Sequence, residues 1–205
     1  MKKVILVVLA LILLPAMVAC AGKPGEAMQA APVSNAEPVE VTIVVPGALL
    51  QAFGGYPQEE LVDLSHDEWV AACAQHFVNS HAGRDGVISV AAQEDGSVAL
   101  VVTAAYQQWL MDAMREQIEF HIAQYTDEGS PAQITGVTFS DDYTECQMKM
   151  NSGSYEEYGS QLMHIFAGDL CFYQIYCGAG EASVSIAVLD TENGGLLGKF
   201  DFPEV

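Results

Sequence analysis

Three pairs of apolar, β-branched segments, each closed around a short polar turn, constrain the fold of this chain most. The paired segments are residues 87–92 with 97–103, 132–139 with 143–150, and 182–189 with 196–202. The turns between them contain Asp95-Gly96, Asp141-Asp142 and Asn193-Gly194, and Asp-Gly and Asn-Gly are typical of tight hairpin turns. The sequence therefore predicts three β-hairpins. A further strand is expected over 39–45, where β-branched residues alternate with others before Pro46.

Single helices are expected between these strand pairs. Ser65 and Glu68 form the pattern of a capping box at the start of a helix that ends near Gly83. A second helix begins after Thr103 and runs to about residue 126 with apolar residues at helical spacing, and a third begins near Ser154 and is the most apolar. Residues 48–64 are interrupted by glycines and a proline and favour only short helical turns.

Hairpins that alternate with single helices predict an α+β domain. We expect a mainly antiparallel sheet, built from the three hairpins plus the N-terminal strand, with about three helices packed on one face.

The N-terminal segment has the order of a secretory signal. Lys2 and Lys3 precede an unbroken apolar run over 4–14, and Pro15 and small residues follow. The sequence Met17-Val18-Ala19-Cys20 resembles the lipobox of bacterial lipoproteins, with methionine in place of the more usual leucine. The resemblance implies that residues 1–19 are removed, that the Cys20 thiol is acylated, and that the protein is held at the cell membrane facing outside the cytoplasm.

Two alternatives to lipidation remain open from the sequence. One is ordinary cleaved secretion. The other is an uncleaved signal anchor, because residues 4–21 carry no charge. That run is near the lower limit for spanning about 30 Å of hydrocarbon, and Pro15 interrupts it. With acylation, a diacylglyceryl group would supply the two chains that stable anchoring requires.

Residues 20–38 are expected to be a lipid-anchored flexible tether. They contain three prolines, and Met28 and Val33 are their only sizeable apolar side chains after the cysteine, so they cannot form a core. The predicted organisation is a signal peptide over 1–19, this tether, and a single extracytoplasmic domain over 39–205.

Charge and cysteine content narrow the class of partner. All 27 acidic residues but only five of the seven basic residues follow Cys20, which gives the processed chain a net charge of −22. Such a chain repels phosphate, so nucleic-acid binding and docking on anionic lipid through a basic face are disfavoured. Four further cysteines, none in a C-x-x-C motif, are expected mainly as free thiols; they are Cys73, Cys146, Cys171 and Cys177.

Familiar catalytic motifs are missing from the sequence. It contains no G-x-S-x-G, no G-x-x-x-x-G-K-[ST] and no H-E-x-x-H, and we expect neither a cofactor nor a metal. The partial calcium-loop pattern over 190–201 has glycine at its fifth position, and a hairpin turn explains it more simply. The candidate site residues are His164, on the most apolar helix, and Asp169, five residues later. His164 is hypothesised as a general base, against the default of a histidine satisfied by a backbone carbonyl.

The segment Glu94-Asp95-Gly96-Ser97-Val98, with Thr103 and Leu110-Met111-Asp112 after it, resembles small uncharacterised lipoproteins of Gram-positive gut anaerobes. The resemblance implies no particular activity. Together these patterns favour a non-enzymatic binding or structural module at the cell surface. Its expected partners are the membrane, through the Cys20 lipid anchor, and a protein, wall component or small-molecule ligand. The alternative is a surface enzyme with a motif-less active site near the third helix.

Overall fold

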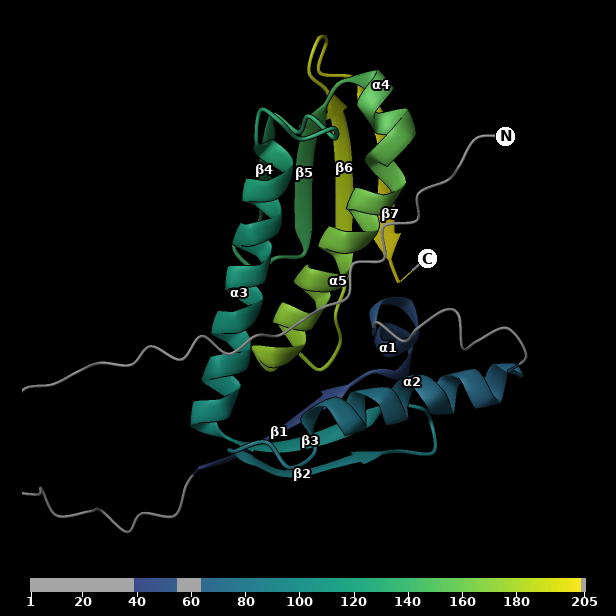
Figure 1. Cartoon of the computed structure of the whole chain (residues 1–205), viewed down its shortest axis with the longest axis vertical. Coiled ribbons are helices and arrows are strands. Elements are labelled where there is room, and N and C mark those ends of the chain that lie inside the picture. Colours follow the sequence, from purple (N-terminus) through teal and green to yellow (C-terminus); the bar gives the residue numbers. More distant parts are fainter. Residues whose placement is uncertain (1–38, 55–63, 204–205) are drawn as a thin grey trace, which may run out of the picture. The chain divides into compact units, whose positions relative to one another are not determined.

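The computed structural model describes residues 39–54 and 64–203, which belong to one compact unit, Glu37–Val205 (Figure 1). Cys20, the expected signal peptide and the expected tether lie outside the described residues. The elements in chain order are β1 Glu40–Val45, α1 Gly47–Phe53, α2 His66–His81, β2 Val87–Ala92, β3 Val98–Thr103, α3 Ala104–Thr126, β4 Gly136–Phe139, β5 Glu145–Met150, α4 Ser152–Ser154, η2 Tyr155–Gly159, α5 Ser160–Tyr176, β6 Val184–Asp190 and β7 Leu196–Phe202.

The α+β class and the three hairpins are confirmed. The pairs β2–β3, β4–β5 and β6–β7 are each antiparallel, and β1 pairs antiparallel with β3. The strands divide, however, between two sheets, β1-β3-β2 and β4-β5-β6-β7, where the sequence led us to expect one. The turn signals specify each hairpin locally but carry no information about which hairpins join, and α3 leads the chain from one sheet to the other.

The larger sheet contains one parallel pair, β5 with β6, in which Glu145 aligns with Ser185. The chain between these strands forms α4, the single π-helical turn η2, and α5. A connection of this length through a helix is the usual way to join parallel neighbours. Figure 1 shows α5 lying over β6, and the two elements are in contact.

The larger sheet buries one face and leaves the other accessible. On β5, the side chains of Cys146, Met148 and Met150 are buried, and the residues between them are exposed. This period-two alternation is that of an antiparallel sheet with one face in the core and one in water. The third expected helix, the most apolar in the sequence, corresponds to α5, in which 11 of 17 residues are buried.

The smaller sheet is covered by α2 and by parts of α3 and α5. α2 begins with the expected capping box, in which the Ser65 hydroxyl accepts from the Glu68 amide and the Glu68 carboxylate accepts from the Ser65 amide. Thr103 caps α3 through the Tyr106 amide. Across 39–54 and 64–203, no helix combines the length and the apolar character needed to cross a membrane.

Candidate functional site

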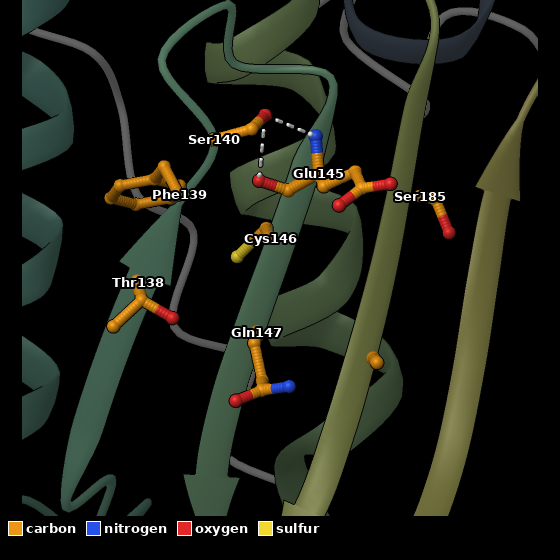
Figure 2. Close-up of a pocket in the computed structure, with 8 residues that line it drawn as sticks. Thr138, Phe139, Ser140, Glu145, Cys146, Gln147 and Ser185 are labelled. Atoms are coloured by element: carbon orange, nitrogen blue, oxygen red, sulfur yellow. Dashed lines mark hydrogen bonds between the residues drawn. The ribbon is translucent and has the colours of Figure 1, made fainter.

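The accessible face of the larger sheet carries a hollow of about 340 Å³ near one end of β4, β5 and β6 (Figure 2). Its polar lining comes from the hydroxyls of Thr138, Ser140 and Ser185, the Gln147 amide and the Glu145 carboxylate, and Ala187 adds an apolar side chain. Phe139 and Cys146 also border it, but their side chains turn to the core face of the sheet. Figure 2 shows the Glu145 side chain extending from β5 towards Ser185 on β6. The parallel register explains this approach, because Glu145 aligns directly with Ser185.

The turn between β4 and β5 fixes the position of Glu145. The Ser140 hydroxyl accepts a hydrogen bond from the Glu145 amide at 2.9 Å, and the Ser140 amide donates to the Glu145 carbonyl at 3.0 Å. Asp142 accepts from the hydroxyls of Ser140 and Thr144 and from the Thr144 amide, and these bonds lower the pKa of Asp142 to about 2. The Ser140 and Asp142 side chains therefore hold the turn in one conformation, and this fixes the backbone position of Glu145 at the start of β5.

Gln174 on α5 connects the two strands beneath the hollow. Its amide nitrogen donates to the Tyr143 carbonyl at 2.8 Å and to the Ser183 carbonyl at 2.9 Å, and its amide oxygen accepts from the Ser183 amide at 3.1 Å. Tyr143 precedes β5 and Ser183 precedes β6. This buried side chain thus holds together the beginnings of the two strands that carry Glu145 and Ser185.

The hollow is suited to binding a polar molecule through hydrogen bonds. Its hydroxyls and amide can both donate and accept, and Glu145 can accept. The Cys146 thiol lies on the buried face of β5, and it is a poor nucleophile because burial raises its pKa to about 12. None of the described residues that line the hollow is a histidine.

The two candidates from the sequence lie elsewhere and have different partners. His164 is exposed on α5, and its ring lies 4.6 Å from the Phe53 ring and 6.5 Å from the Phe200 ring, centre to centre. Asp169 faces α3, where its Oδ2 lies 2.6 Å from Nδ1 of His121. Neither His164 nor Asp169 lines the hollow.

The His121–Asp169 pair is a buried polar contact between α3 and α5, with side chains 9% and 13% exposed. Burial raises the pKa of Asp169, and the hydrogen bond from His121 opposes that rise. An ionised carboxylate only accepts, so Nδ1 of His121 donates to it, and Nε2 faces the Gln117 side-chain amide at 2.9 Å. Both ring nitrogens are therefore occupied, which makes this pair a structural link between helices.

The sequence did not lead us to His121 as the partner of Asp169, or to the hollow on the larger sheet. The available signal for His121 was its place on the apolar side of a clear amphipathic helix, where a polar residue needs a partner. The hollow had no signal in the sequence, because it depends on β5 and β6 lying side by side.

Within the described part of the chain, no group of three or more histidine, cysteine, aspartate or glutamate side chains is arranged to hold a metal ion. The residues over 190–201 form the expected hairpin, in which Asp190 accepts from the Glu192 amide and Asp201 pairs with Lys199. All four described cysteines are free thiols, with only Cys177 exposed. The chain matches no protein-family model, no curated protein and no solved structure.

Proposed function

We propose that this protein is a lipid-anchored extracytoplasmic binding module that holds a small, polar, neutral or cationic ligand in the hollow over β4, β5 and β6. The observation that carries the proposal is the hollow itself: about 340 Å³ on an accessible sheet face, lined by three hydroxyls, an amide and one carboxylate. Its volume is at the small end of the range for ligand sites. Glu145 and the strongly negative chain disfavour anions.

Binding without catalysis is favoured by what surrounds the titratable groups. The buried histidine–carboxylate pair has both imidazole nitrogens engaged and lies outside the hollow lining. The Cys146 thiol faces the core behind the hollow, and burial holds it protonated. A general base needs a free nitrogen or carboxylate within reach of the substrate. Neither of these two groups supplies one, and among the described residues that line the hollow the Glu145 carboxylate has no histidine or reactive thiol beside it to act with.

The binding half of the proposal is tested by filling the hollow. The variant Gln147→Trp places a large ring in the lining, and Lys149→Trp is the matched control because Lys149 is the next exposed residue on the same strand and lies outside the lining. Surface extract from the producing cells is passed over each immobilised protein, and retained small molecules are identified by mass spectrometry. The proposal requires a compound retained by the wild type and by Lys149→Trp but lost with Gln147→Trp; equal retention by all three would refute it.

The anchoring half rests on the lipobox-like sequence that ends at Cys20. Cells fed an alkyne analogue of palmitate should label the wild-type protein, and Cys20→Ala should abolish the label and release the protein from the membrane fraction. Mass spectrometry of the wild type should show Cys20 as the first residue, carrying acyl chains. An unmodified thiol, or a retained leader, would refute this half and leave the binding half standing.

A further inference from the structure

The β2 edge of the smaller sheet has no charge or proline along the strand, and a bulge at its start is the feature that guards it. Natural proteins guard exposed edges with charges, proline, bulges or short strands. β1 begins with Glu40, β4 has only four residues, and β7 carries Lys199 and Asp201. β2, with the sequence VISVAA, has six residues, no charge and no proline, and its Ile88 is 47% exposed.

The hydrogen-bonding groups left free on β2 follow from its register with β3. The Gln93 amide donates to the Ser97 carbonyl, and Ala92 is aligned with Val98. Because successive residues of an antiparallel strand alternate in direction, the N–H and C=O groups of Val90 and Ala92 point away from β3. The bulge between Val87 and Ser89 confines this regular edge to the second half of the strand. Four backbone groups are therefore available to an added strand.

The surroundings of this edge specify the chemistry of its occupant. Val87 and Val90 pack on the core beneath α2, which contacts β2, whereas Ser89 and Ala91 are exposed on the opposite face. A strand alongside β2 would therefore place apolar side chains towards α2 and polar ones outwards. The turns at the two ends of β2 carry exposed carboxylates.

These carboxylates are Asp85 before the strand, which is more exposed than its half-buried neighbour Arg84, and Glu94 after it. They favour positive charge at both ends of an added strand. A second copy of the chain does not provide this charge, because each copy is itself strongly negative, with a formal charge of −20.

We infer that the β2 edge docks an extended segment of a partner protein, with alternating apolar and polar residues and basic residues at both ends. The partner segment adds a fourth strand to the β1-β3-β2 sheet, in the mode known as β-augmentation. Backbone hydrogen bonds to Val90 and Ala92 give affinity, and the charges at the ends set position. This surface belongs to the smaller sheet, so the inference is independent of the hollow.

The test uses the full-length chain and a fluorescent seven-residue peptide in which valine and threonine alternate between terminal arginines. Binding is followed by fluorescence anisotropy, and amide exchange of the protein is followed by mass spectrometry or NMR. Saturating peptide should slow exchange of the Val90 and Ala92 amides at least tenfold, and replacing both arginines of the peptide with glutamates should weaken binding at least tenfold.

Substitutions at Ala92 separate backbone pairing from other contacts. Ala92→Pro removes one outward N–H without removing a bond to β3, which edge strands tolerate, and it should weaken binding at least tenfold. Ala92→Ser keeps the N–H and should bind as the wild type does, and Gln147→Trp in the hollow should leave peptide binding unchanged.

Three outcomes would overturn the inference. They are absence of peptide binding, binding that leaves the Val90 and Ala92 amides unprotected, and wild-type affinity in an Ala92→Pro protein with an unchanged melting temperature. Sedimentation that shows the chain alone as a dimer, with these two amides already protected, would assign the edge to a second copy and overturn it equally.

Discussion

Replacing Gln174 with methionine should loosen the frame beneath the hollow at little cost in volume. The substitution removes three hydrogen bonds, two to backbone carbonyls and one from a backbone amide. At about 0.5–1.5 kcal/mol for each bond, the loss is bounded at roughly 1.5–4.5 kcal/mol. Ser183 is exposed, so water can satisfy its two groups again. We therefore expect a loss near the low end of that range, about 2 kcal/mol, in the free energy of unfolding.

The measurement is urea unfolding followed by far-ultraviolet circular dichroism, with three matched proteins. Gln75→Met is the control, because Gln75 is exposed on α2 and bonds only to the neighbouring Asn79 side chain. It should lie within about 0.5 kcal/mol of the wild type. Gln174→Glu should be less stable than Gln174→Met at neutral pH, since it sets a carboxylate oxygen against the Tyr143 and Ser183 carbonyls.

The stability of Gln174→Glu should also depend on pH in a characteristic way. Protonation of the introduced carboxyl restores a donor, so Gln174→Glu should recover stability relative to Gln174→Met as the pH falls. Either of two results would contradict this role of Gln174: a loss in Gln174→Met no greater than in the Gln75 control, or a Gln174→Glu protein as stable as the wild type at neutral pH. Because the same bonds align the strands carrying Glu145 and Ser185, Gln174→Met should also reduce retention of the ligand.

Three further predictions address other parts of the domain. Gly198→Ala would place a methyl group against the Tyr155 phenol and should lower the free energy of unfolding by about 1–3 kcal/mol, as measured with urea. The control is Gly136→Ala, which also lies on a strand but has nothing within 4 Å of the added carbon, and it should lower that free energy much less. Burial raises the pKa of Asp169 in the folded protein, so its carboxyl binds a proton more readily when folded. The stability of the wild type relative to Asp169→Asn should therefore fall as the pH rises from below 3.8 through the raised pKa. A stability difference that stays constant with pH would contradict this prediction. In a variant that lacks Cys20, Ellman's reagent should modify only Cys177 before unfolding and all four described thiols afterwards. Fewer than four reactive thiols after unfolding would indicate a disulfide.

The elements of the fold could be predicted because their signals are local. Asp95-Gly96 and Asn193-Gly194 each close a hairpin, with Gly96 and Gly194 at the positive φ that such turns need. Ser65 and Thr103 cap their helices as expected. The division into two sheets could not be predicted in the same way, since an apolar strand edge pairs equally well with any other until the helices between them are placed.

The hollow depends on the parallel pairing of β5 with β6, which local sequence signals do not specify. Glu145 and Ser185 are forty residues apart, and only the parallel pairing of β5 with β6 aligns them. That pairing is supported by Gln174, whose sequence neighbours are apolar and give no sign of its role. A buried glutamine on the most apolar helix was nevertheless a usable signal, because its amide must find partners when α5 packs.

Helical geometry explains why His164 and Asp169 do not form one site. At 3.6 residues per turn, a spacing of five places two side chains about 140° apart around the axis. Asp169 shares its side of α5 with Phe166 and Tyr173, at spacings of three and four residues. All three residues contact α3. Phe166 contacts the His121 ring, Asp169 contacts Nδ1 of His121, and Tyr173 accepts from the Arg115 guanidinium. His164 lies instead towards Phe53 and Phe200. The polar residues at 121 and 169 thus lie at the contact between α3 and α5. Because both ring nitrogens of His121 are engaged there, this pair offers a ligand no free imidazole nitrogen.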